Sequence, residues 1–180
     1  MRAALAILVL SGCLPVAETL PPGYPPQIGT VTADLNGAAQ NWDTYDYSIS
    51  ASDAAVQITS FDGLQFRMMG DPAGRPSSDA NRLLVKGDMR AVTQTGALSD
   101  PVIEIITGKA FDGPRLTSVG SEVSLVLDSL TPMTADRYGH VTGHFKTTLC
   151  QAIGQPARID RTACQPFKGN FSSDLQITGG

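Results

Sequence analysis

The sequence predicts an all-β protein, folded as an antiparallel β-sandwich, a jelly roll or a barrel of about eight strands. Polar and apolar residues alternate over short runs, which is the pattern of half-buried strands. Clusters of Gly, Pro, Asn and Asp separate these runs at regular intervals, as turns do in sandwiches and barrels. The predicted strands are 28–35, 42–49, 64–69, 82–87, 102–107, 123–130, 140–150 and 167–177.

The first two strands are predicted to form a hairpin, because the alternation of 28–35 runs directly into Asn36-Gly37. This dipeptide is a strong signal for a two-residue hairpin turn. Further turn signals, which separate the later strands, lie at 61–63, 71–74, 100–101 and 111–114. One stretch differs: in 50–59, alanines and Ile58 recur at helical spacing, which favours one short helix.

The last two strands show the clearest alternation. Val141 and Phe145 share one face of the first, and Phe167, Phe171 and Leu175 share one face of the second. Side chains of one parity lie on one side of a strand, so each of the two strands has one apolar face.

The first thirteen residues have the layout of a secretory signal. Arg2 precedes the unbroken apolar run 3–10, and two small residues then lead to Cys13. Such a run suits the apolar part of a signal peptide, about 7–15 residues, and is far shorter than the roughly 20 residues that span a bilayer. The ending Leu10-Ser11-Gly12-Cys13 resembles the lipobox of bacterial lipoproteins. The resemblance implies cleavage before Cys13 and a covalent diacylglycerol and N-acyl lipid, such as palmitate, on that cysteine.

This resemblance divides the chain into three parts. Residues 1–12 are the expected cleaved signal peptide, residues 13–27 are the lipidated cysteine and a proline-rich tether, and residues 28–180 are a single β-sandwich domain. Prolines in the tether disfavour helix and sheet, and an extended polyproline conformation would give it a reach of about 40 Å. Leu14 resembles the residue that follows the cysteine in outer-membrane lipoproteins. We therefore expect the protein to face the periplasm, anchored in the outer membrane.

Cysteine usage agrees with this interpretation. The chain has three cysteines, and an odd number is awkward in an exported protein. With lipid on Cys13, Cys150 and Cys164 remain as a pair, and a disulfide is expected in an oxidising compartment. The segment between them is predicted to be a loop, whose closure would stabilise the fold by about 3 kcal/mol. A metal site would need further ligands, and nothing in the spacing indicates a redox pair.

The end of the chain adds a weaker resemblance. A strand with Gly143-His144-Phe145, a cysteine-closed hairpin and a last strand with Gly169-Asn170-Phe171 are similar to many uncharacterised bacterial lipoproteins. This likeness covers residues 28–49 and 138–177 and implies no particular activity.

Candidate catalytic and metal-binding groups are few. His140 and His144 are the only histidines, and on a strand they would lie about 13 Å apart, too far for one metal ion. No Gly-x-Ser-x-Gly motif occurs, the nearest stretch being 119–122. The stretch 71–79 has only a faint likeness to a calcium loop. Acidic residues in the first third invite a glycosidase hypothesis, but Asp is also typical of turns and caps: Asp34, Asp43, Asp46, Asp53 and Asp62. We expect no enzyme, no cofactor and no metal.

Three aromatic residues, Trp42, Tyr45 and Tyr47, lie close together beside acidic residues. Their rings could contact a sugar, but alternation splits them between two faces and favours a core role for Trp42, because aromatic side chains dominate core energetics. The net charge of −4, without a cluster of Lys and Arg, disfavours nucleic acid as a partner. We expect a structural or accessory envelope protein with an unidentified protein partner. The alternative is a module that binds carbohydrate or a cell-wall ligand, and an enzyme comes third.

Overall fold

All regular structure in the computed structural model is β-sheet. The structure describes residues 25–47, 56–59, 63–108, 113–131, 139–154 and 156–178. Within these ranges, eleven strands form one continuous hydrogen-bonded sheet. They are β1 (Gln27–Leu35), β2 (Ala38–Tyr45), β3 (Val56–Thr59), β4 (Gln65–Pro72), β5 (Arg82–Asp88), β6 (Gly96–Ala97), β7 (Ser99–Ile106), β8 (Arg115–Thr117), β9 (Val123–Thr131), β10 (Gly139–Ile153) and β11 (Arg158–Thr178).

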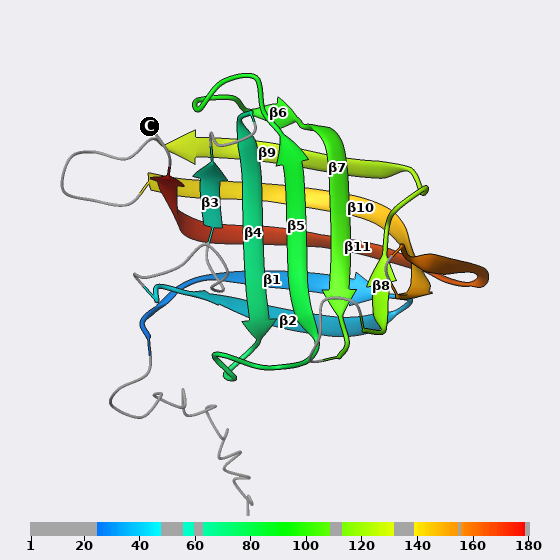
Figure 1. Cartoon of the computed structure of the whole chain (residues 1–180). Helices are drawn as coiled ribbons and strands as arrows, with labels where there is room; N and C mark the ends of the chain where they lie inside the picture. The colour runs from blue at the N-terminus through cyan, green and yellow to red at the C-terminus, as the bar shows by residue number, and fades with distance from the viewer. Residues whose placement is uncertain are drawn as a thin grey trace, which may run out of the picture.

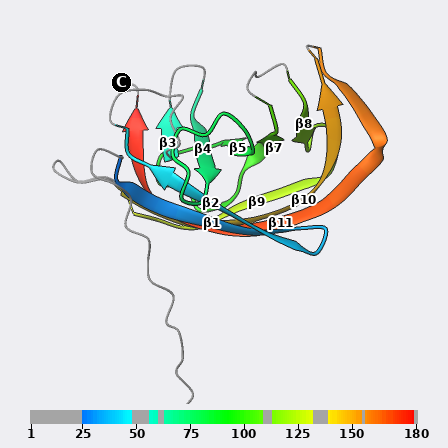
Figure 2. The same ribbon diagram turned by 90° about the horizontal axis from the view of Figure 1, so that it is seen from below.

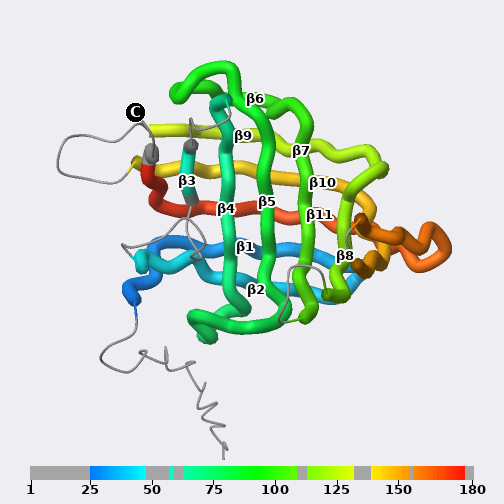
Figure 3. The backbone as a smooth tube through the Cα atoms, in the orientation of Figure 1, coloured from blue at the N-terminus to red at the C-terminus, as the bar shows by residue number. Residues whose placement is uncertain are grey.

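The sheet folds back on itself to make two layers (Figures 1 and 3). One layer contains β2, β1, β11, β10 and β9 in this order, with β6 at its edge. The other contains β3, β4, β5, β7 and β8, which run crosswise over the first layer. Seen from below, the long curved strands β10 and β11 rise from one layer toward the other (Figure 2). Strands that change layers in this way make the corners of an orthogonal sandwich.

Ladder pairings show how these corners close. Residues 140–147 of β10 pair with β9, whereas 150–152 pair with β8 in the crosswise layer. The end of β11, residues 175–178, pairs in parallel with β3. On the opposite side, β2 pairs with β4. Eight strands therefore form a closed ring in the order β2-β1-β11-β10-β8-β7-β5-β4, and closure leaves few exposed edges.

The predicted fold class is confirmed, and each of the eight predicted strands overlaps a strand of the structure. The first hairpin is also confirmed. Leu35 pairs with Ala38, and the two turn residues have φ angles of 53° at Asn36 and 87° at Gly37. Because both angles are positive, the turn is of the type that matches the twist of its strands.

The short helix predicted over 50–59 is wrong for its described part. Residues 56–59 form β3, and residues 50–55 lie outside the described ranges. The reason is tertiary: β3 lies between β11 and β4 and pairs with both, so a helix would leave two ladders without partners. Strands β6 and β8 were not predicted, because two or three residues carry no periodicity.

The core lies between the two layers and is rich in aromatic rings. Trp42 meets the edge of Phe167 at a centroid distance of 6.1 Å, and Phe66 of the crosswise layer stacks on Phe171 at 5.7 Å. The apolar residues that share one parity on the last two strands are all buried: Val141, Phe145, Phe167, Phe171 and Leu175.

The two Gly-x-Phe motifs pair reciprocally in the β10–β11 ladder. Gly143 lies opposite Phe171, and Gly169 lies opposite Phe145. A Cβ atom on Gly143 would be 2.3 Å from Cζ of Phe171, and one on Gly169 would be 2.7 Å from Cζ of Phe145. Each ring therefore occupies the space that a side chain on the facing glycine would need, and aromatic rings that cover strand glycines in this way help to set register.

The predicted disulfide between Cys150 and Cys164 is present, with an S–S distance of 2.03 Å. It joins directly opposed residues of β10 and β11. The prediction of a loop between the cysteines is wrong, because both strands continue past the disulfide as far as the pair Ile153–Arg158. A register shift after Cys150 leaves residues 161–163 of β11 as a bulge.

Candidate functional site

The aromatic residues of the sugar-binding hypothesis lie mainly in the interior. Trp42 is 3% exposed and Tyr45 is fully buried. The indole N–H of Trp42 donates to the carbonyl oxygen of Asn81 at 2.7 Å, and the Tyr45 ring lies 6.3 Å from that of the half-buried Tyr47. Stacking on a sugar needs an open ring face, so in this structure Trp42 and Tyr45 form no such platform. Trp42 instead has the core role that alternation favoured.

Beside these rings, the carboxylates of Asp43 and Asp71 lie on directly opposed residues of β2 and β4. Asp43 accepts hydrogen bonds from Nε2 of Gln27 at 3.0 Å, from the backbone N–H of Gly74 at 2.8 Å and from the Tyr45 hydroxyl at 3.2 Å. All of these donors come from the protein, and Gly74 belongs to the loop between β4 and β5.

Asp71 is 1% exposed and holds the same loop. It accepts hydrogen bonds from the backbone N–H of Ser77 at 2.6 Å and the Tyr47 hydroxyl at 3.2 Å, and Nε of Arg82 lies 3.2 Å from it. Burial raises the pKa of Asp71, while the N–H of Ser77 and the charge of Arg82 act in the opposite direction. Burial also raises the pKa of Tyr47. The two carboxylates thus form a latch for loop 73–81, and their burial argues against the acid pair of a glycosidase.

The other acidic candidates and the calcium-like stretch give no metal site. Asp34 accepts a hydrogen bond from the backbone N–H of Gly37 at 2.8 Å, which is the predicted turn role. Asp53 and Asp62 lie outside the described residues. Within the described ranges, no group of three or more His, Cys, Asp or Glu side chains is arranged to hold a metal ion.

The two histidines lie on the outward face of β10, as their spacing on a strand predicts, and each pairs with a different neighbouring strand. Nδ1 of His140 lies 2.9 Å from the carboxylate of Asp174 on β11. Nδ1 of His144 lies 3.0 Å from the carboxylate of Asp128 on β9. Asp128 is the extra residue where the β9–β10 register shifts. The histidines therefore belong to two separate pairs and do not share one site.

His140 also contacts Ser172, with 3.1 Å between Nε2 and the serine Oγ. Asp174, His140 and Ser172 are thus connected in the order of a serine-hydrolase triad. A hydrolase also needs free donors for an oxyanion. Here β11 pairs with β1 on one side and β10 on the other at this position, so the backbone N–H groups around Ser172 serve the sheet. The three residues therefore make a polar surface rather than a complete hydrolytic site.

These residues belong to a larger surface, which we call the polar face. It consists of the outward side chains of the layer that contains β1, β11, β10 and β9. Its members are Thr30, Thr32, Asp34, Lys168, Asn170, Ser172, Asp174, His140, Thr142, His144, Lys146, Asp128 and Ser129. This surface was not predicted from the sequence. The signal in the sequence was the run of polar residues at alternate positions of the two Gly-x-Phe strands, which are the positions that face outward.

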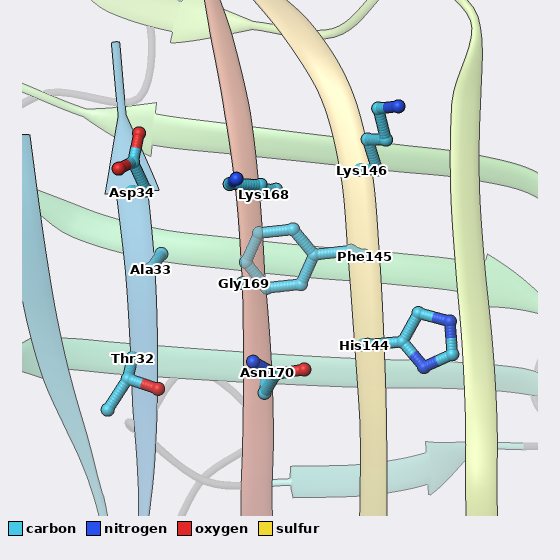
Figure 4. A pocket seen from close by; sticks show the side chains of 9 residues that line it. All are labelled: Thr32, Ala33, Asp34, His144, Phe145, Lys146, Lys168, Gly169 and Asn170. Atoms are coloured by element: carbon cyan, nitrogen blue, oxygen red, sulfur yellow. The ribbon is translucent and has the colours of Figure 1, made fainter. Parts of the chain in front are cut away.

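A hollow of about 460 Å³ lies at one end of the polar face (Figure 4). We call it the lysine hollow, because Lys168 of β11 and Lys146 of β10 line it as directly opposed residues. Asp34 is the neighbour of Lys168 on β1, and the facing pair Asn170 and His144 lies one row further along. Like charges directly opposite each other in a sheet are destabilising, so this pair of lysines costs the fold some stability.

A second hollow, of about 600 Å³, lies where β8, β10 and β11 meet at the corner of the two layers. Arg115, Arg158 and Asp160 contribute charged groups to it. Nε of Arg115 lies 3.3 Å from the carboxylate of Glu104, so this cation already has a partner. The lysine hollow is therefore the better candidate for a ligand.

Residues 13–24 of the predicted anchor and tether, including Cys13, lie outside the described residues. The folded domain begins slightly before the predicted boundary at residue 28. The carbonyl oxygen of Pro26 accepts a hydrogen bond from the backbone N–H of Asp46 at 2.9 Å, and Gln27 is the first residue of β1. In the part of the chain that the structure describes, no helix is long and apolar enough to cross a membrane.

Neither a protein-family model, nor a curated protein, nor a solved structure matches this chain.

Proposed function

We propose that the protein is a lipid-anchored accessory protein of a bacterial cell envelope, attached through Cys13 and facing the periplasm from the outer membrane. The observation that carries this proposal is the use of its three cysteines. Cys150 and Cys164 are joined to each other, which leaves Cys13 as the remaining thiol, directly after the lipobox-like residues 10–12. A structural disulfide is also typical of exported proteins.

The domain's role in this proposal is binding rather than catalysis. The buried latch of Asp43 and Asp71 is occupied by protein donors, and the main-chain donors near Ser172 belong to the sheet. The polar face, in contrast, presents hydroxyl, amide and charged groups outward on a rigid layer. A tether with a reach of about 40 Å would let this face meet another envelope component.

Expression of the full chain with Cys13→Ser in a bacterium that processes lipoproteins tests the anchor. The variant should remain as unprocessed, non-acylated precursor, whereas the parent should gain the mass of its lipid and partition into detergent. The double variant Cys150→Ala/Cys164→Ala is the matched control, because it removes cysteines but not the lipidation site, and it should still be acylated. A Cys13→Ser protein with the same processing and membrane partitioning as the parent would overturn the proposal.

A further inference from the structure

We propose that the polar face binds an acidic glycan, a sugar chain with carboxylate or phosphate groups, and that Lys146 and Lys168 hold one of its anionic groups in the lysine hollow. This deepens the proposed function, because it names a ligand class for the face that an envelope-anchored domain would present. It rests on the proposed function, which places the domain in the cell envelope, where it would meet such a ligand.

The cationic and amide donors in the lysine hollow are not used by the fold. Lys146 and Lys168 are exposed and directly opposed. Among the described residues, neither ammonium has a hydrogen bond or ion pair, and the amide of Asn170 has no hydrogen-bond partner either. Lysines at opposed positions of a ladder repel each other, and the Lys146 side chain points away from Lys168 (Figure 4). An anion bound between the two ammonium groups would relieve that repulsion.

Groups that neighbour the two lysines are already oriented. The carboxylate of Asp128 holds Nδ1 of His144 at 3.0 Å, which fixes the imidazole at the border of the lysine hollow. Asp34, the single acidic residue of this lining, accepts a hydrogen bond from the backbone N–H of Gly37 at 2.8 Å. The lining therefore has more hydrogen-bond donors, from two ammonium groups and one amide, than acceptors, because its single carboxylate already accepts a hydrogen bond from Gly37. This excess of donors favours a ligand rich in acceptors.

The rest of the polar face indicates the class of anion. Beyond the lysine hollow, the polar face continues along β11 and its neighbours with hydroxyl groups on Thr30, Thr142 and Ser172. Hydroxyl and amide groups on the outward side of this layer match the many hydroxyls of a sugar chain. The net charge of −4 opposes general attraction of polyanions, so binding would depend on these local cations. Together, a local cationic end and a long hydroxyl-bearing face fit an acidic glycan better than an isolated ion.

Binding of polygalacturonate to the full-length protein, purified in detergent, tests the inference by isothermal titration calorimetry at low and high salt. We expect saturable binding that weakens as salt rises. The variant Lys146→Gln/Lys168→Gln should bind about tenfold more weakly or worse, because it loses charge-assisted hydrogen bonds. The matched control is Lys86→Gln/Arg90→Gln. It removes the same charge from Lys86 in β5 and from Arg90 just after β5, and it should bind like the parent.

Three results would overturn the inference: no saturable binding of polygalacturonate at low salt, an equal loss in the matched control, or equal binding of neutral dextran. Equal binding of polyglutamate would also contradict it, because the ligand class would then be acidic polymers without a role for sugar. This assay does not depend on the lipid. Failure of glycan binding with Cys13 still acylated would refute only this inference, and loss of the anchor with glycan binding intact would refute only the proposed function.

Discussion

Substitution of Gly143 by alanine tests the reciprocal Gly-x-Phe pairing of β10 and β11. A Cβ atom at this position would be 2.3 Å from Cζ of Phe171 and 2.4 Å from the carbonyl oxygen of Val126. The phenyl ring could tilt away, but the carbonyl belongs to β9, which is paired with β10 at this point. Relief of both contacts therefore requires a strand to move.

The expected magnitude follows from two opposing effects. Forcing an extra methyl group into a packed core costs about 1–3 kcal/mol, whereas alanine gains about 0.5–1 kcal/mol over glycine within a strand. Because a backbone atom must move at Gly143, the upper part of the first range applies. We expect a net loss of about 2 kcal/mol in the free energy of unfolding, equivalent to about 4–8 °C in Tm for a domain of this size.

Thermal and urea unfolding, followed by circular dichroism, measure this loss. Gly108→Ala is the matched control, because its Cβ would meet only Pro114, with the nearest atom at 3.3 Å, and its Tm should change little. The double variant Gly143→Ala/Phe171→Leu should lose less free energy of unfolding than the two single variants lose together. We expect this coupling to be at least about 0.5 kcal/mol. A Gly143→Ala protein with unchanged or higher Tm would refute the reasoning.

Three further perturbations have expected outcomes. Reduction of the Cys150–Cys164 disulfide should lower the free energy of unfolding by about 3 kcal/mol, seen as a drop in Tm with dithiothreitol that the double alanine variant no longer shows; an unchanged parent Tm would contradict it. Asp71→Ala should cost about 2–3 kcal/mol in urea unfolding, because the Ser77 N–H, the Tyr47 hydroxyl and Arg82 lose their buried acceptor. Burial raises the folded-state pKa of Asp71, so ionisation of this carboxyl group disfavours folding. The contribution of Asp71 to the free energy of unfolding should therefore be greatest at pH values below its unfolded-state pKa and should fall as the pH rises through its folded-state pKa. Asp71→Asn should lack this pH dependence. Lys146→Glu should raise stability by about 0.2–1 kcal/mol, because it replaces a like-charge pair with an ion pair to Lys168, and a lower Tm would argue against their direct opposition.

Local patterns predicted much of the fold because the relevant interactions are close in sequence. Asn36-Gly37 specifies its turn through the φ angles that these two residues accept. Alternation identified the inward residues of the last two strands, because side-chain direction on a strand follows a period of two. The disulfide could be paired without a structure, since two cysteines remained once Cys13 was assigned to lipid.

The sequence-based predictions were wrong or incomplete where contacts with distant segments determine the local structure. Residues 56–59 form a strand because β11 and β4 provide ladders on both sides of it, and the β11 partner lies more than 100 residues away, at 175–178. Trp42 was correctly expected in the core, but Tyr45 is also buried, with its hydroxyl bonded to Asp43 and its ring beside Tyr47.

By itself, the sequence determined the all-β class, the hairpin turn, the inward faces of the long strands, the cysteine pairing and the anchor hypothesis, since each depends on local pattern or residue count. Apart from the first hairpin and the disulfide-linked last two strands, only the tertiary structure decided which strands are neighbours and in which register they pair. The strand pairings and their register place Lys146 opposite Lys168, His140 beside Asp174 and each Gly-x-Phe glycine under the facing ring. The physical reason is that register and layer crossing depend on contacts between residues far apart along the chain, about which periodicity carries no information.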